Sequence, residues 1–349
     1  MDEIKGNRIY KLEGIDALIK KLTSKGYRVI GPKKEDNLEF FGEIQSGGNI
    51  CRNQINPNNS IKEFFLPRCE KVLSFKYVSK KVKIKEPREI TGKTVIIGAK
   101  PCDTASLPIL DKLFANDCAD KFWFEKRELT TVISIACTKC DEYCFCTSVN
   151  LSPNSKKGCD IMLTEEQAGR FFAETVTDKG ENLANEVLGI LSKCDNISQE
   201  QIDRASLKIS KVDKKFNHDK VKQRLDVNFE NDLWAEFSRQ CIGCGTCTFL
   251  CPTCHCFDIV DEGKLNNGSR LKNWDACQMK TFTVHTSGHN PRETQDQRWR
   301  QRIMHKFRYY VDKFDEILCV GCGRCSRHCP VDMNISECLT LIEEKKDQE

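Results

Sequence analysis

The sequence contains no apolar run of about 18 residues, the length that a membrane-spanning helix requires. Residues 1–22 lack an apolar signal core with a small-residue cleavage site, and they lack a twin arginine. These absences predict a cytoplasmic protein that makes no contact with a membrane. Lysine and arginine (55) exceed aspartate and glutamate (51) by only four, which is too small an excess to indicate a nucleic-acid partner.

Signatures of nucleotide binding and of common hydrolases are also missing. No GxGxxG follows an expected strand and no GxxxxGK[ST] occurs, so neither a dinucleotide nor a nucleoside triphosphate site is indicated. HExxH and GxSxG are absent as well. No motif therefore identifies a substrate site, which favours a protein that transfers electrons and leaves a catalytic cluster as the alternative.

Cysteine, in contrast, is abundant, with 22 among 349 residues. A cytosol keeps thiols reduced, so dense cysteine in a cytosolic chain indicates metal binding more than disulfides. Hydrophobic residues (39%) and charged residues (30%) are in the proportions of a soluble globular protein, and the length favours two domains.

The expected fold is an α+β or α/β domain over residues 1–228, followed by a mainly helical, two-cluster ferredoxin-like domain over 229–349. Buried strand-like runs at 94–100 and 130–136 and helical spacing at 181–194 support the first domain. The composition changes after the polar stretch 211–231, where the cysteine-rich part begins.

Two cysteine runs carry the chemistry. Residues 241–252 read CIGCGTCTFLCP, and residues 319–330 read CVGCGRCSRHCP. Both follow C-x2-C-x2-C-x3-C-P, the bacterial ferredoxin run in which three thiolates hold one 4Fe–4S cluster and the fourth reaches the other. The first predicted cluster takes Cys241, Cys244, Cys247 and Cys329, and the second takes Cys319, Cys322, Cys325 and Cys251.

The spacing of these cysteines has a physical reason. Three thiolates within seven residues surround a cluster only if the loop is tight and its amides point inward. Glycines permit such backbone angles because they carry no Cβ, and we expect this of Gly243, Gly245, Gly321 and Gly323. The alternative is zinc, which usually takes two C-x2-C pairs separated by a longer loop. Three evenly spaced cysteines with a CP ending, given twice, fit zinc poorly.

A further group of thiols lies in the first domain, where residues 137–146 read CTKCDEYCFC. The runs 94–100 and 130–136 end just before Cys102 and Cys137, and sites in α/β sheets gather beyond the carboxyl ends of parallel strands. If the two strands are parallel neighbours, both cysteines lie on one edge of the sheet. Five thiols at that edge favour a third cluster over small buried side chains, although free cysteine is often buried.

Cys254, Cys256 and Cys277 lie outside both runs. With a histidine such as His255 they could form a further metal site; the alternative is thiols packed beside a cluster. The remaining cysteines are isolated, and we expect ordinary packing or surface roles for Cys51, Cys69, Cys118, Cys159, Cys194 and Cys338. The basic segments 76–93 and 292–310 are expected to be solvated faces.

Several segments together resemble the β subunit of cytoplasmic sulfhydrogenases, and they are equally similar to the iron–sulfur electron-transfer subunit of anaerobic sulfite reductase. They are KPCD (100–103), CFC (144–146), the run 241–258, GHNPRE (288–293), HKF (305–307) and the run 319–330. The resemblance implies that the third cluster uses Cys102, Cys137, Cys144 and Cys146, with Cys140 as the spare thiol. Cys254, Cys256 and Cys277 also match family positions.

The resemblance further implies partners. A γ-type flavoprotein subunit that binds FAD and NAD(P)H would supply electrons, and this chain would pass them on one at a time. The acceptor would be a catalytic subunit, either a hydrogenase, a sulfite reductase or a heterodisulfide-reductase-like module. The alternatives are a stand-alone reductase that acts on a small molecule at the third cluster, and a redox-sensing or structural protein. The double ferredoxin run argues against a sensor, because a sensor rarely needs two linked clusters.

Overall fold

The computed structural model describes residues 8–46, 50, 55–87, 92–193 and 199–345. Within these ranges no helix is both long and apolar enough to cross a membrane. The chain forms two compact units that are discontinuous in sequence, unlike the continuous domains 1–228 and 229–349 that we predicted. The first unit consists of residues 1–61, 92–215 and 319–323, and the second of residues 62–91, 216–318 and 324–349.

The first unit is built on an eight-stranded mixed sheet in the order β10-β1-β9-β8-β7-β6-β2-β3. The four central strands β8, β7, β6 and β2 run parallel, and the outer pairs are antiparallel. The strands are β1 Ile9–Leu12, β2 Arg28–Glu35, β3 Leu38–Glu43, β6 Thr94–Ala99, β7 Thr130–Ile135, β8 Ile161–Gln167, β9 Arg170–Thr175 and β10 Leu191–Lys193. This sheet confirms the α/β character expected of the N-terminal part.

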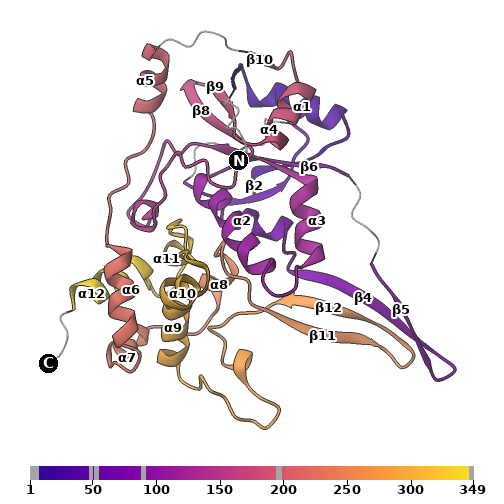
Figure 1. The fold of residues 1–349 in the computed structure, drawn as a ribbon, viewed down its shortest axis with the longest axis vertical. Helices are drawn as coiled ribbons and strands as arrows, with labels where there is room; N and C mark the ends of the chain where they lie inside the picture. Colours follow the sequence, from indigo (N-terminus) through magenta and orange to yellow (C-terminus); the bar gives the residue numbers. More distant parts are fainter. Residues whose placement is uncertain (1–7, 47–49, 51–54, 88–91, 194–198, 346–349) are drawn as a thin grey trace. The chain divides into compact units, whose positions relative to one another are not determined.

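Helices cover this sheet, with α2, α3 and α4 packed against β7 and α1 packed against β2 (Figure 1). They are α1 Ile15–Ser24, α2 Pro101–Phe114, α3 Lys121–Leu129, α4 Asp178–Glu186 and α5 Gln199–Leu207, with the short turn η3 Cys146–Val149. β6 and β7 are buried throughout because helices occupy the sheet's faces. The helix expected at 181–194 is shorter than predicted: it ends at Glu186, and Leu191–Lys193 form an edge strand, while residue 194 lies outside the described residues.

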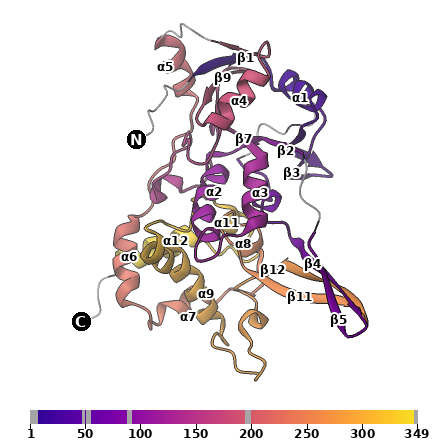
Figure 2. The ribbon, with the colours of Figure 1, turned by 45° about the vertical axis from the view of Figure 1, so that its right-hand side comes forward.

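The second unit contains helices and a four-stranded antiparallel sheet in the order β11-β12-β4-β5 (Figure 2). The strands are β4 Cys69–Val78, β5 Lys81–Lys85, β11 Phe257–Lys264 and β12 Asn267–Trp274. The expectation of a mainly helical C-terminal domain is therefore not confirmed. β12 forms strand hydrogen bonds because it pairs with β4, a strand from far earlier in the chain.

The helices of the second unit are α6 His218–Val227, α7 Leu233–Ser238, α8 Thr246–Phe249, α9 Gln295–Met304, α10 Tyr310–Phe314, α11 Arg324–Arg327 and α12 Ile335–Glu344. Short turns are η2 Ile61–Phe64, which begins at the last residue of the first unit, and η4 Lys280–Thr283. A π-helical segment, η5 His305–Tyr309, joins α9 to α10. π-Bulges inside helices frequently mark functional sites, and this one contains Lys306.

Candidate metal centres

The glycines of both cysteine runs adopt the backbone conformation that we predicted. Their φ angles are +69° and +77° at Gly243 and Gly245, and +62° and +72° at Gly321 and Gly323. A residue with a Cβ rarely adopts such angles, so these positions require glycine for the tight loops.

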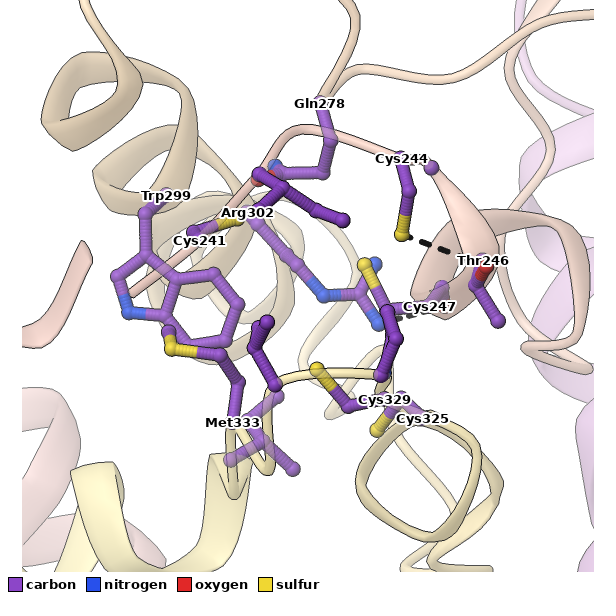
Figure 3. Close-up of a pocket in the computed structure, with 15 residues that line it drawn as sticks. Cys241, Cys244, Thr246, Cys247, Gln278, Trp299, Arg302, Cys325, Cys329 and Met333 are labelled. Carbon is purple, nitrogen blue, oxygen red and sulfur yellow. Dashed lines mark hydrogen bonds between the residues drawn. The ribbon is translucent and has the colours of Figure 1, made fainter. Parts of the chain in front are cut away.

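Cysteines of both runs line one hollow of about 440 Å³ in the second unit (Figure 3). We call it the ferredoxin pocket. Its cysteines are Cys241, Cys244, Cys247, Cys325 and Cys329. The structure thus brings together all four predicted ligands of the first cluster. Cys325, which we assigned to the second cluster, lines the same hollow.

Hydrogen bonds orient several of these sulfurs. Gln295 Nε2 donates to Cys241 Sγ at 3.1 Å, and the Cys244 thiol donates to Thr246 Oγ1 at 3.4 Å. Burial raises the pKa of Cys241, and it raises the pKa of Cys247 to about 12. The buried groups therefore remain neutral thiols unless a cation replaces their protons, as a metal ion does when it binds thiolate.

Three cations are buried beside these cysteines in the second unit. The exposed fraction is 1% for Arg302 and 2% for Lys62 and Lys306. Lys306 Nζ donates to Cys251 Sγ at 3.4 Å and to Thr253 Oγ1 at 3.0 Å. Lys306 and the hydrogen bond from Cys254 lower the pKa of Cys251, the bond from Cys254 having the larger effect.

Arg302 and Lys62 contact the next thiol of the same segment. Arg302 donates to Cys254 Sγ at 3.3 Å and to the Cys247 carbonyl at 2.8 Å. Lys62 Nζ donates to the Cys254 carbonyl at 2.8 Å and lies 3.9 Å from the Trp274 ring centroid. Burial lowers the pKa of Lys62 to about 8.

These cations test whether the residues fit an iron–sulfur cluster. In the part of the chain that the structure describes, Arg302 and Lys62 contact thiols, hydroxyls and carbonyls, and none of these contacts goes to a carboxylate. The buried Arg302 Nε has no hydrogen-bond partner there. Because an unpaired buried charge costs several kcal/mol, the arrangement requires a compensating anion. A thiolate-bound cluster carries negative charge, so the donor set fits it.

Sequence reasoning missed these cations. We expected residues 292–310 to be a solvated basic face, yet Arg298, Arg302 and Lys306 are all buried. The signal was present, because these three cations are spaced four residues apart and so lie on one face of a helix.

The predicted ligands of the second cluster are divided between the two units. Cys319 and Cys322 belong to the first unit, whereas Cys251 and Cys325 belong to the second. The assignment of these four cysteines to one cluster therefore stays a prediction.

A second hollow, of about 380 Å³, lies in the first unit, and we call it the sheet-edge pocket. β6 and β7 are parallel neighbours, as the sequence predicted, and Cys102 and Cys137 follow them on the same edge. The cysteines that line the pocket are Cys102, Cys137, Cys140, Cys144, Cys146 and Cys322. Burial raises the pKa of Cys137, and it raises the pKa of Cys146 to about 12.

The second cysteine run supplies one wall of this pocket. The Phe145 N–H donates to the Gly321 carbonyl at 2.9 Å, and Asn56 Nδ2 donates to the Cys322 carbonyl at 2.9 Å. The loop 319–323 is thereby fixed against the CFC segment within the first unit. Cys140 differs from its neighbours, because it is exposed and its thiol donates to the Lys211 carbonyl at 3.2 Å.

This difference leads to a prediction for the third set of cysteines. Replacing Cys144 with serine should remove about four irons per chain, the content of one 4Fe–4S cluster. Replacing Cys140 with serine should leave the iron content unchanged, because this thiol is already bonded to backbone. Iron analysis of the two variants checks both outcomes, and a loss of iron only in the Cys140 variant would contradict the choice of ligands.

The remaining predicted thiols, Cys254, Cys256 and Cys277, lie near the ferredoxin pocket. Cys254 contacts Arg302, and the thiols of Cys256 and Cys277 are hydrogen-bonded to each other. His255 Nδ1 lies 3.1 Å from the Thr253 carbonyl, and burial lowers its pKa to about 4. Among the described residues, no three His, Cys, Asp or Glu side chains are arranged to hold a single metal ion. A metal site at these three cysteines stays a prediction.

The isolated cysteines vary in their surroundings. Cys69 and Cys118 are exposed, whereas Cys159 and Cys338 are buried. Cys51 and Cys194 lie outside the described residues.

Comparison with known proteins agrees with the cysteine pattern. Residues 240–333 match the family described as 4Fe-4S dicluster domain. The chain is 28% identical over 324 residues to sulfhydrogenase 2 subunit beta of Pyrococcus furiosus, covering 91% of this chain and 92% of that protein. The chain therefore has a 4Fe–4S dicluster domain and is, over most of its length, a homologue of a sulfhydrogenase β subunit.

Proposed function

We propose that this chain is the iron–sulfur electron-transfer subunit of a cytoplasmic multisubunit redox complex. It relays single electrons between a flavoprotein subunit that oxidises NAD(P)H and a catalytic subunit. That catalytic subunit would be a hydrogenase, a sulfite reductase or a heterodisulfide-reductase-like module. The similarity to a protein named as a sulfhydrogenase subunit supports a complex with catalytic subunits.

One observation carries the proposal. Cys322, a predicted ligand of the second cluster, lines the sheet-edge pocket together with the cysteines predicted to hold a third. A cluster in that pocket would therefore lie beside a ligand of the next one, as a chain of electron carriers requires. Each 4Fe–4S cluster, when bound, accepts and releases one electron.

The residues of this chain would hold and tune such carriers. Cys241, Cys244, Cys247 and Cys329 would bind the first cluster in the ferredoxin pocket. Lys306 and Arg302 stabilise negative charge on the adjacent sulfurs by donating hydrogen bonds to them. Hydrogen bonds to sulfur and nearby charge are the factors that set cluster potentials.

Replacing Cys322 with alanine tests the relay. We expect transfer between the partner subunits to be abolished, because a ligand of the second cluster is lost. Oxidation of NAD(P)H by the isolated flavoprotein subunit, measured with an artificial acceptor, should continue at the full rate. Replacing Cys159, a buried cysteine of the first unit outside both pockets, serves as the control and should leave transfer intact. Undiminished transfer in the Cys322 variant would contradict the proposal.

A second candidate function is reduction of a small molecule at the sheet-edge pocket. It is favoured by the hollow itself, which five cysteines of the first unit line in addition to Cys322. Reduction of a substrate by the isolated chain, with dithionite as donor, would support this function. A chain that passes electrons only to a partner subunit would not show it.

A further inference from the structure

Cys256 and Cys277 lie at the open end of the β11–β12 hairpin. Phe257 pairs with Trp274 at the last step of the ladder, and the Asp275 N–H then donates to the Cys256 carbonyl at 3.0 Å. The hairpin thus fixes the two cysteines beside each other. Their thiols are in hydrogen-bonding contact, and the Cys277 N–H donates to the Cys256 sulfur.

Polar groups hold the Cys277 sulfur in this position. Gln278 Nε2 donates to it at 3.6 Å, and Thr248 Oγ1 lies 3.8 Å from it. Both cysteines are partly buried, and neither belongs to a ferredoxin run. Two fixed thiols in contact can form a disulfide without a large backbone movement.

The pair also lies next to the ferredoxin pocket. Arg302 donates to Thr248 Oγ1 at 3.5 Å and to the Cys247 carbonyl at 2.8 Å. Only Thr248 therefore separates the Cys277 sulfur from Cys247, its neighbour in sequence and a predicted ligand of the first cluster. An electron that reaches the first cluster has a short route to the pair.

We propose that Cys256 and Cys277 form a redox-active dithiol that exchanges two electrons with the iron–sulfur clusters. In the oxidised form the two sulfurs share a disulfide bond. Two electrons, delivered one at a time from reduced clusters, break that bond, and two protons from water complete the two thiols. The site therefore stores an electron pair beside one-electron carriers. This inference rests on the proposed function, because the clusters supply the electrons.

The test uses the full chain with its clusters, purified under anoxia. Samples equilibrated in dithiothreitol buffers of defined potential are quenched in acid, alkylated, digested with trypsin and analysed by mass spectrometry. Cleavage after Arg239, Lys264, Lys272 and Lys280 places Cys256 in peptide 240–264 and Cys277 alone in peptide 273–280. We expect these peptides to be linked in oxidised samples. The ratio of linked to free peptide should change tenfold across about 30 mV, the slope of a two-electron couple.

Variants separate the dithiol from a metal site. Cys256→Ser and Cys277→Ser should each abolish the link and keep the iron content of the unaltered chain, and the alanine variants should do the same. Cys338→Ser, at a buried cysteine outside the group, should keep the link. Full alkylation of both cysteines at every potential would overturn the inference, and so would a loss of iron in the Cys277 variants, which would make this thiol a metal ligand. Failure of the proposed function would appear differently, as an unaltered chain that lacks iron.

Discussion

Replacing Lys306 with methionine should lower the reduction potential of the cluster that Cys251 binds by about 60–130 mV. Lys306 is buried and donates to Cys251 Sγ at 3.4 Å. A hydrogen bond to a charged group contributes about 1.5–3 kcal/mol, and 1.4 kcal/mol corresponds to about 59 mV for one electron. The reduced cluster carries more negative charge, so losing the cation destabilises the reduced form. A redox titration followed by electron paramagnetic resonance measures the shift.

Two further variants control this measurement. Lys306→Arg keeps the positive charge and should retain most of the potential. Lys272→Met removes another buried lysine of the same unit, one that forms an ion pair with Glu70 at 2.9 Å, and it should leave the potential unchanged. An unchanged potential in the Lys306→Met variant, or an equal shift in the Lys272→Met variant, would show that Lys306 does not act on the cluster.

Replacing Gly321 with alanine should remove the second and third clusters together. The added Cβ would lie 2.5 Å from the Cys146 nitrogen, and the φ angle of +62° is unfavourable for alanine. The loop 319–323 must then move away from the CFC segment, which displaces Cys319 and Cys322 as well as Cys146. Iron content should fall from about twelve to about four atoms per chain, since each cluster contains four irons.

Gly26 provides the matched control for this prediction. Its φ angle is +83°, and a Cβ there would meet no atom within 4 Å. Gly26→Ala should therefore cost only the backbone strain of about 1–2 kcal/mol and keep all of the iron. A Gly321→Ala variant with the full iron content would contradict the proposed contact between the second ferredoxin loop and a third cluster.

The local patterns of the sequence predicted much of the first unit and of the ferredoxin pocket. The buried runs 94–100 and 130–136 became the parallel strands β6 and β7, because continuous apolar runs are typical of strands covered on both faces. The four glycines of the cysteine runs adopted positive φ angles because the loops are tight. Such features depend on a few neighbouring residues, and sequence spacing reveals them.

Features that depend on distant partners were not predicted. β12 pairs with β4 across almost two hundred residues, so the sheet of the second unit has no local signal. The burial of Lys62 and Arg302 likewise depends on the fold, because a basic residue is usually solvated unless an anionic site surrounds it. The packing of loop 319–323 on the CFC segment joins residues of the first unit that are far apart in sequence.

The most direct test of the three-cluster relay is a count of iron and acid-labile sulfide in the chain purified under strict anoxia. We predict about twelve of each per polypeptide, four for each of three clusters. About eight of each would contradict the relay as proposed. In that case the cysteines of the sheet-edge pocket would hold no cluster, and the first unit would act only as a scaffold for the two ferredoxin clusters.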